Sequence, residues 1–349
     1  MLFLGTLAKT MEHEIIAAAE ALSGAQVTTA KPLHGGANNR VYKVETQTGP
    51  FALKVYPHLA EDLRDRLGAE FDGLTFLNSH NINGVPKAIA CDRNGGLGLY
   101  EWIEGEAIVA PGVDDIDAAA DFVQKLKVLS QDVSAIKLPL ASEACLSGAE
   151  IVSQIKGRLD HLGSVGEDQD QKNFLEIEFV PFFEKAVSRA RNGYQQAGWN
   201  FDSDIVQDQR TLSPSDFGFH NALKVPSGEV VFIDFEYFGW DDPVRLVADF
   251  ILHPGMTLNQ ATKNRFARRS FTILADDDNF RLRLDLLFPL VGLRWAMILL
   301  NEFIPERWRR RSLAGAGEDM AVAQMKQLEK AHRLLKSLKN PDKGLFYDN

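Results

Sequence analysis

A change of hydrophobic pattern near Glu104 and Gly105 limits the fold of this chain more than any other feature of its sequence. Before this point, residues 26–103 hold short runs rich in β-branched and aromatic residues, separated by turns that contain Gly and Asn. Such runs predict antiparallel strands, as a meander over residues 26–57 and then as a hairpin of two strands at 85–91 and 97–103. Beyond it, apolar residues recur mostly at helical spacing. We therefore expect an α+β chain, with a small antiparallel sheet first and a larger, mostly helical part second.

The length of 349 residues suggests about two domains. We place an N-terminal tail and helix in residues 1–25, the sheet with one main helix in 26–105, the helical part in 106–339 and a tail in 340–349. Helices are expected at about residues 12–22, 60–79, 114–133, 146–161, 170–195, 243–253, 257–275, 280–303 and 317–338. We expect residues 1–10 to fray and the polar stretch 163–172 to form a surface loop.

The charge and cysteine content exclude several classes of protein. A net charge of −10 and a pI near 5.4 leave no basic surface for broad nucleic-acid binding. Cys91 and Cys145 lie far apart and have no C-x-x-C spacing, so neither a zinc site nor a disulfide framework is indicated. The start lacks the basic leader of a signal peptide, and no run reaches the ~18 apolar residues of a membrane-spanning helix. We expect a cytoplasmic protein without a membrane span.

Three polar residues within the helical part carry the strongest chemical signal. Asp216 is followed five positions later by Asn221, and Asp234 ends an apolar run after a short turn. In phosphoryl transfer, one carboxylate orients the attacking hydroxyl, while an amide and a second carboxylate hold Mg²⁺ against the nucleotide phosphates. Asp216, Asn221 and Asp234 supply groups of these kinds, so the pattern predicts a site for phosphoryl transfer. Taken alone, these residues also fit an ordinary turn and a capping aspartate.

A glycine-containing turn and a lysine precede them. The turn holds Gly35, Gly36, Asn38 and Asn39, and glycine lets backbone N–H groups approach phosphates closely, although a tight hairpin without a ligand also explains it. Alternation puts Lys54 on one face of a predicted strand together with Ala52 and Tyr56.

Glu70 lies at the border of the apolar stripe of the next helix, so it can face the sheet. A Lys54–Glu70 pair at that seam can hold the ammonium toward phosphates, although Glu70 also fits a solvated helix charge. The last strand of the sheet runs out into the linker near residue 105, so Glu101 and Ile103 can offer backbone groups to an adenine edge.

Together these segments resemble the aminoglycoside phosphotransferase and choline/ethanolamine kinase superfamily of small-molecule kinases. The resemblance covers about residues 26–300 and rests on five matches in order. These are the turn at Gly35–Arg40, Leu53-Lys54-Val55, Glu70, the segment Leu99–Gly105 and the stretch from Asp216 to Glu236. The resemblance implies a two-lobed, protein-kinase-like fold that uses ATP and Mg²⁺.

The resemblance also implies residue roles. Asp216 orients and deprotonates the acceptor hydroxyl, Asn221 and Asp234 bind Mg²⁺, and Lys54, positioned by Glu70, holds the α- and β-phosphates. Glu236 lies two places beyond Asp234 and is expected to touch a metal-bound water or the substrate. Asp242 is expected to cap the following helix or to brace the site.

One departure concerns the residues before the catalytic aspartate. The family usually has His-Gly there, and this chain has Pro214-Ser215. The missing histidine mainly braces the loop, and proline can stiffen it by fixing φ. His220 is a possible substitute; we interpret it as a packed or capping histidine rather than a substrate contact.

The acceptor is expected beside the helices that follow residue 243. The candidate lining residues are Glu236, Trp240, Arg294, Trp295 and Glu302, with Trp295 more typical of a core position. Basic residues at 263–269 and 307–311 indicate an anionic or sugar acceptor, an acidic partner, or a solvated helix face.

The function expected from these features is transfer of the γ-phosphoryl group of ATP to a hydroxyl of a sugar, amino alcohol or aminoglycoside-like molecule. Two alternatives remain at this stage. One is a nucleotide-binding pseudokinase that regulates without turnover. The other is a kinase that acts on a protein or a protein-bound group.

Overall fold

The computed structural model describes residues 2–33, 39–56, 64–165, 168–313 and 319–340. The chain divides into two compact units. Unit 1 consists of residues 1–107 and 221–238, and unit 2 of residues 108–220 and 239–349. The stretch that holds Asn221 and Asp234 therefore belongs to the same unit as the N-terminal sheet, whereas Asp216 belongs to unit 2.

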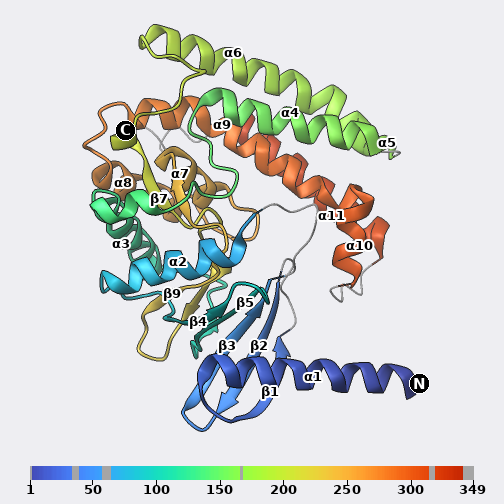
Figure 1. The fold of residues 1–349 in the computed structure, drawn as a ribbon. Helices are drawn as coiled ribbons and strands as arrows, with labels where there is room; N and C mark the ends of the chain where they lie inside the picture. Colours follow the sequence, from blue (N-terminus) through green and yellow to red (C-terminus); the bar gives the residue numbers. More distant parts are fainter. Residues whose placement is uncertain (1, 34–38, 57–63, 166–167, 314–318, 341–349) are drawn as a thin grey trace. The chain divides into compact units, whose positions relative to one another are not determined.

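Unit 1 contains the expected antiparallel sheet, drawn in blue to teal in Figure 1. Its five strands pair in the order β1-β2-β3-β5-β4. They are β1 Val27–Leu33, β2 Arg40–Thr46, β3 Gly49–Val55, β4 Ala88–Asp92 and β5 Leu97–Glu101. The turn after Asp92 joins β4 and β5 as a hairpin, and the Asp92 carboxylate accepts hydrogen bonds from the backbone N–H groups of Asn94 and Gly95.

Two helices pack against this sheet, α1 (Leu2–Ser23) and α2 (Arg66–Ser79). Alternation along β3 sends neighbouring side chains to opposite faces. Leu53 is fully buried in a core that also holds Ala19 of α1. Lys54, the next residue, meets Glu70 of α2 on the other face. The strand thus contributes a core residue and a site residue from adjacent positions.

A short hairpin carries the two residues predicted to bind metal. It is built from β8 (Ala222–Lys224) and β9 (Val230–Phe232), and β6 (Glu106–Ala107) pairs with β8 as a third strand. The Phe232 N–H donates to the carbonyl of Gly84 at 2.8 Å, which joins the hairpin to the segment before β4. These bonds explain why residues 221–238 cluster with the N-terminal sheet.

Unit 2 is mostly helical. Its α-helices are α3 Val113–Leu129, α4 Gly148–Val165, α5 Gln169–Asn173, α6 Val180–Gln196, α7 Pro243–Leu252, α8 Gln260–Ile273, α9 Phe280–Leu299, α10 Pro305–Leu313 and α11 Met320–Lys339. Its other elements are the short helices η1 Val133–Lys137, η3 Gln207–Gln209 and η5 Leu300–Phe303, the π-helical turn η2 Phe174–Phe179, and strands β7 Thr211–Ser213 and β10 Gly239–Asp241, which pair antiparallel. A further turn, η4 Phe219–Asn221, leads into the β8–β9 hairpin.

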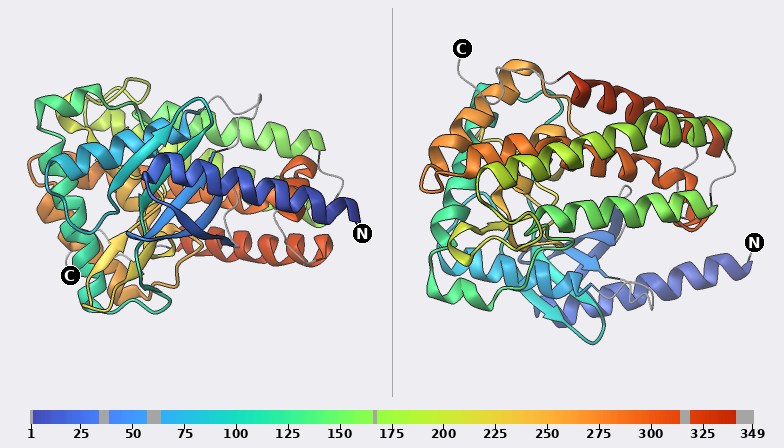
Figure 2. Two further views of the ribbon diagram at one scale, coloured as in Figure 1. Left: turned by 60° about the horizontal axis from the view of Figure 1, so that its bottom comes forward. Right: turned by 90° about the horizontal axis from the view of Figure 1, so that it is seen from above.

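Helix α9 forms the centre of unit 2. Helices α4, α6, α7 and α11 all pack against it (Figure 2). It is apolar around most of its circumference, as expected for a helix with neighbours on several sides. In the described part of the chain, Phe280–Phe303 is the one helix with the length and hydropathy of a membrane span, and 78% of its apolar window is buried in the protein, as in a core helix.

Several helix predictions are confirmed, two local predictions are wrong, and one helix was not predicted. Helix α1 begins at Leu2, so residues 2–10 are helical rather than frayed. In the expected loop at 163–172, α4 continues to Val165 and Asp168 caps α5, its carboxylate accepting from the backbone N–H of Gln171. Helix α10 was not predicted. Most of the expected tail at 340–349 lies outside the described residues.

Candidate functional site

The predicted site residues fall into two groups, one in each unit. In unit 1, the Lys54 ammonium donates to Glu70 Oε1 and to Asp234 Oδ1, each at 2.7 Å. Glu70 is almost fully buried and also accepts from the Tyr56 hydroxyl at 2.5 Å and from the Phe235 N–H at 3.3 Å. The structure therefore brings Lys54, Glu70 and Asp234 together from a strand, a helix and the end of a hairpin.

The electrostatics of this cluster keep the lysine charged. Burial alone would lower the pKa of Lys54, but the carboxylates of Asp234 and Glu70 outweigh it and raise that pKa well above its usual value. Burial also raises the pKa of the Glu70 carboxyl, against the effect of the Lys54 ammonium. A charged ammonium held in a fixed position is suited to contacting phosphate oxygens.

The backbone brings the two predicted metal ligands close. The Ile233 N–H donates to the carbonyl of Asn221 at 2.9 Å, so Asn221 and Asp234 lie at one end of the hairpin. Asp234 has a left-handed backbone, with φ of 67°, a conformation that Asp tolerates better than most residues. Its side chain is 35% exposed, and Oδ2 accepts no hydrogen bond from the described residues. An amide and a partly exposed carboxylate fit Mg²⁺, which prefers hard oxygen ligands.

The Glu236 carboxylate binds protein groups. Its side chain is nearly buried and accepts from Asn39 Nδ2 and Arg66 Nη1, each at 3.0 Å. It therefore connects the end of the glycine turn to α2. Gly35, Gly36 and Asn38 lie outside the described residues.

The two residues expected at an adenine edge differ in their backbone bonds. The Glu101 N–H donates to the Lys87 carbonyl at 2.9 Å, so that donor is used within the sheet. Ile103 follows the end of β5, and none of the described residues forms a backbone hydrogen bond with it. Ile103 is the better placed of the two to bind a ligand through its backbone.

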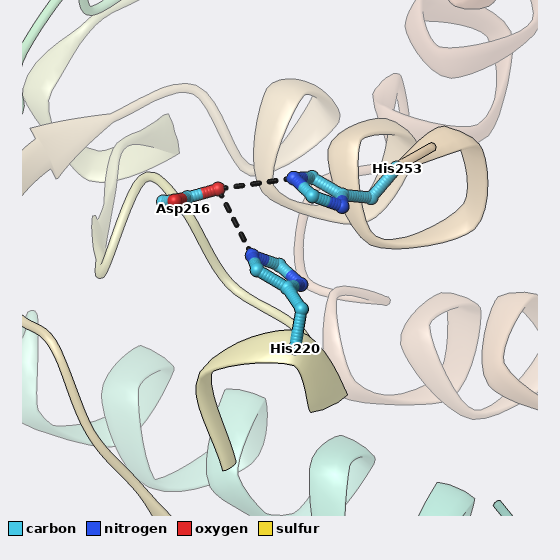
Figure 3. A group of neighbouring side chains, drawn as sticks. All are labelled: Asp216, His220 and His253. Atoms are coloured by element: carbon cyan, nitrogen blue, oxygen red, sulfur yellow. Dashed lines mark hydrogen bonds and ion pairs between the residues drawn. The ribbon is translucent and has the colours of Figure 1, made fainter. Parts of the chain in front are cut away.

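In unit 2, Asp216 is held by two histidines (Figure 3). His220 Nε2 lies 3.1 Å and His253 Nε2 lies 3.2 Å from the same oxygen, Asp216 Oδ1. The two imidazole rings stack in parallel, with centroids 3.7 Å apart and planes 3° apart. The edge of Trp295 packs on His253, at 4.4 Å between centroids. The Asp216 side chain is still 34% exposed, so a ligand can reach it.

The geometry of this trio favours hydrogen bonding over metal binding. The three ligand atoms are close enough to surround an ion. However, imidazole lone pairs lie in the ring plane, and two parallel stacked rings cannot both direct theirs at one ion between them. The Gly255 N–H donates to His253 Nδ1 at 3.0 Å, so the proton of the neutral ring is on Nε2, which faces Asp216. His253 therefore donates to the aspartate.

These donors control the charge of Asp216. Burial alone would raise its pKa, but the hydrogen bonds from His220 and His253 lower it well below its usual range. Burial lowers the pKa of His253, which keeps its ring neutral near pH 7. Asp216 is thus a carboxylate with a fixed orientation.

The residues that replace His-Gly have their own support. Ser215 has a φ of 68°, in the left-handed region where glycine is favoured. Its hydroxyl donates to the Ser142 carbonyl at 3.2 Å and accepts from Arg245 Nη2 at 2.8 Å. Arg245 is buried and also binds Asp241, at 2.7 Å, and Asp249, at 3.1 Å. The serine side chain thus fixes a backbone conformation that glycine would adopt without help.

The remaining predicted residues support the fold around Asp216. Trp240 Nε1 donates to the Ala135 carbonyl at 2.9 Å, and Trp295 Nε1 donates to Asp249 Oδ1 at 2.7 Å. Both rings are buried, which places them in the core. Arg294 binds Glu143 Oε2 at 2.6 Å, and the backbone carbonyl of Glu302 accepts from Gln324. The expectation that Asp242 caps a helix is confirmed, because its carboxylate accepts from the Val244 N–H at the start of α7.

Sequence reasoning missed His253 and Arg245. His253 follows α7 and gives no local signal, since its partner lies on a different segment. Arg245 stands four residues after Asp241 and four before Asp249, a spacing that favours ion pairs along a helix face. That spacing could have indicated that Arg245 forms ion pairs within the fold. It could not have indicated that Arg245 donates a hydrogen bond to Ser215.

Comparison with known proteins identifies the family of this chain and similar folds. A sequence model for a phosphotransferase enzyme family matches residues 29–281. A sequence search of curated proteins finds no match. A solved spectinomycin phosphotransferase, in complex with ADP and spectinomycin, has a TM-score of 0.65 at 10% identity, covering 94% of this chain and 96% of that one.

Two choline kinases are also similar. The one from Cryptosporidium parvum Iowa II has a TM-score of 0.58 at 12% identity, over 94% of this chain and 96% of that chain. LicA from Streptococcus pneumoniae has 0.54 at 17% identity, over 94% and 99%. These likenesses confirm the protein-kinase-like α+β fold. Because the family model spans most of the chain, this protein belongs to the phosphotransferase enzyme family.

Proposed function

We propose that this protein transfers the γ-phosphoryl group of ATP, with Mg²⁺, to a hydroxyl group of a small molecule. The observation that carries the proposal is the position of Lys54. Its ammonium is held by buried Glu70 and by Asp234, a residue with the ligand chemistry and exposure that Mg²⁺ requires. Phosphoryl transfer needs a cation for the phosphates and oxygen ligands for the metal, and this cluster supplies both.

In this proposal, unit 1 binds the nucleotide. Lys54 contacts phosphate oxygens, Asn221 and Asp234 hold Mg²⁺, and the backbone of Ile103 contacts the base. The bound ion would neutralise charge on the phosphates during transfer. Glu236 has a structural role, because its carboxylate accepts hydrogen bonds from both Asn39 of the glycine turn and Arg66.

Asp216 supplies the other requirement, a carboxylate for the acceptor. It accepts a hydrogen bond from the acceptor hydroxyl, directs the hydroxyl oxygen at the γ-phosphorus, and takes the hydroxyl proton as the new P–O bond forms and the bond from the γ-phosphorus to the ADP oxygen breaks. A carboxylate with a lowered pKa is a weak base, so orientation is its larger contribution. His220 and His253 act through Asp216 as positioning residues, the role that the resemblance implies for the missing histidine.

The test is a screen for acceptor-stimulated ATP turnover. Purified protein is incubated with Mg²⁺ and γ-labelled ATP, together with single compounds from a set of sugars, amino alcohols and aminoglycosides. ADP formation and the labelled product are both measured. We expect one class of compound to raise ADP formation and to carry the label, and Asp216→Asn to remove both effects.

Two other outcomes would replace this proposal. Saturable nucleotide binding without turnover for any acceptor would favour the nucleotide-binding regulator, which the substitution of Pro214-Ser215 for His-Gly allows. Label that appears in protein rather than in a small molecule would favour a kinase acting on a protein-bound group. Neither outcome would change the assignment to the phosphotransferase family.

A further inference from the structure

A cavity in unit 2 lies beside the segment that supports Asp216. Its volume is about 550 Å³, and it lies between α4, the end of α9 with η5, and α10. Its polar lining includes Glu143, Gln154, Arg158, His161, Asn301 and Arg307. Arg245 joins the cavity wall to the catalytic loop, since its guanidinium donates to the Glu143 carbonyl at 2.6 Å and to the Ser215 hydroxyl at 2.8 Å.

Positive charge exceeds negative charge at one end of this cavity. Arg158 and Arg294 share a single carboxylate, that of Glu143, at 2.9 and 2.6 Å. Arg158 contacts Glu143 through Nη2 alone, and the Nε and Nη1 atoms of Arg158 donate to none of the described residues. Arg307 has no acidic partner in the part of the chain that the structure describes. The second glutamate of the lining, Glu150, stands in the first turn of α4, two turns away from Arg158.

The arginines influence one another. Burial lowers the pKa of Arg158, Glu143 raises it, and the nearby Arg294 and Arg307 lower it further. Burial alone would raise the pKa of Glu143, but Arg158 and Arg294 bring it to about 2, so this carboxylate is already neutralised. An anion placed between Arg158 and Arg307 would relieve the remaining repulsion.

The cavity does not suit the positively charged acceptors used by some relatives. None of its described lining residues is Phe, Tyr or Trp, so it contains no aromatic cage for a quaternary ammonium group. A polycation would be repelled by Arg158 and Arg307. The apolar side chains of Leu162, Met297 and Ile304 complete the wall and suit the carbon skeleton of a small molecule.

We propose that this cavity binds an oxyanion of the acceptor, a phosphate or carboxylate group, through Arg158 and Arg307. The inference rests on the proposed function, because it names the class of molecule that is phosphorylated. The acceptor then carries both a hydroxyl, presented to Asp216, and a negatively charged group held by the two arginines. Sugar phosphates and sugar acids have this combination.

The first experiment measures anion binding without nucleotide. Inorganic phosphate is titrated at constant ionic strength, and binding is followed by the rise in Tm. We expect saturable binding that weakens about tenfold in Arg158→Gln and in Arg307→Gln, because each removes one charged donor. Arg158→Lys keeps the charge and should bind within about threefold of the parent protein.

Two control variants locate the anion. Arg309→Gln changes an exposed arginine on α10 that does not line the cavity, and it should leave phosphate binding unchanged. Lys54→Met removes the cation proposed for the nucleotide phosphates, and it shows whether the measured phosphate binds there instead. Loss of binding in Lys54→Met together with normal binding in the Arg158→Gln, Arg307→Gln double variant would overturn the inference, as would the absence of saturable binding.

The second experiment uses turnover and separates this inference from the proposed function. Neutral sugars are compared with their phosphate and carboxylate forms as acceptors. We expect the anionic forms to have the higher kcat/KM, and Arg158→Gln to raise their KM about tenfold without changing the KM for ATP. Turnover with neutral or cationic acceptors only would retain the kinase and reject the anion site. Phosphate binding without any turnover would retain the site and reject the kinase.

Discussion

Asp234 of unit 1 and Asp216 of unit 2 are held in opposite ways. Asp234 is paired with a buried ammonium, Lys54, which is itself shared with a second carboxylate. Asp216 accepts hydrogen bonds from two imidazole N–H groups on one oxygen. Around Asp234, one ammonium faces two carboxylates, and a bound divalent cation would balance the remaining negative charge. Around Asp216, the two hydrogen bonds fix the orientation of the carboxylate. We infer that substitutions in the unit 1 cluster act mainly by changing its charge. Substitutions around Asp216 in unit 2 act mainly by changing the orientation of its carboxylate.

The largest expected effect tests the charge side of this comparison. Asp234→Ala leaves Lys54 paired only with Glu70 and removes a metal ligand, so Mg²⁺-dependent nucleotide binding should fall by at least ~10²-fold. Calorimetric titration of ADP with and without Mg²⁺ measures the change. Magnesium-dependent binding of normal strength in this variant would remove Asp234 from the proposed metal site.

The next effect tests Asp216 of unit 2. Asp216→Asn keeps the size of the side chain, but it removes the charge and basicity and replaces one of the two acceptor oxygens with an NH2 donor. Acceptor-stimulated turnover should fall on the order of 10²–10⁴-fold, while the affinity for nucleotide stays within about twofold. Stopped assays combined with nucleotide titration give both numbers. A parallel loss of nucleotide affinity would mean that the two aspartates do not have separate roles.

A smaller effect is expected at His253. His253→Ala removes one of two donors to Asp216, and a hydrogen bond to a charged group contributes about 1.5–3 kcal/mol, so kcat should fall about ten- to a hundredfold with little change in the KM for ATP. His253→Gln can still donate and should recover part of the rate. His332→Ala, a partly exposed histidine elsewhere in unit 2, serves as the matched control.

A role of His253 in folding alone would give a different result. In that case the rate loss would follow the loss of Tm, and the glutamine variant would rescue neither. The NMR signals of the imidazole nitrogens provide a readout independent of turnover, since we expect His253 to be protonated on Nε2. A ring protonated on Nδ1 would contradict the contact with Asp216.

The smallest effect concerns the ion pairs that lie behind the Asp216 loop. The pKa of Glu143 is about 2 in the folded protein, below its ordinary value of 4.5. Its carboxylate therefore stabilises the fold fully above about pH 4.5, and this contribution is lost as the pH falls toward 2. Urea unfolding at pH 6 and pH 3 should show a smaller pH-dependent loss of stability in Glu143→Gln than in the parent. Equal losses would mean that Glu143 is not strongly paired.

Lys54 and Glu70 show which parts of the site could be predicted from sequence. Each position follows from a local rule, alternation for the strand and helical spacing for α2. The hairpin between Asn221 and Asp234 also follows from a local rule, because a turn between two apolar runs predicts that the runs pair as strands.

His253 shows which parts could not. The contact between His253 and Asp216 depends on where the chain runs after α7, and no periodicity encodes that path. Helix α10 was missed because its segment, with Arg307, Arg309 and Glu306, has no apolar stripe that would indicate a buried face. Its position next to α9, rather than its own pattern, makes it part of a cavity wall.

The support of Ser215 by Arg245 bears on how relatives of this protein are recognised. A motif search that requires glycine immediately before the aspartate would reject any homologue in which a hydrogen-bonded serine fills that position. A search profile that also rewards an arginine at the place of Arg245 and a histidine at the place of His253 would retain such homologues. The two types of loop would then be alternative evolutionary solutions for presenting one aspartate, each with its own set of covarying positions.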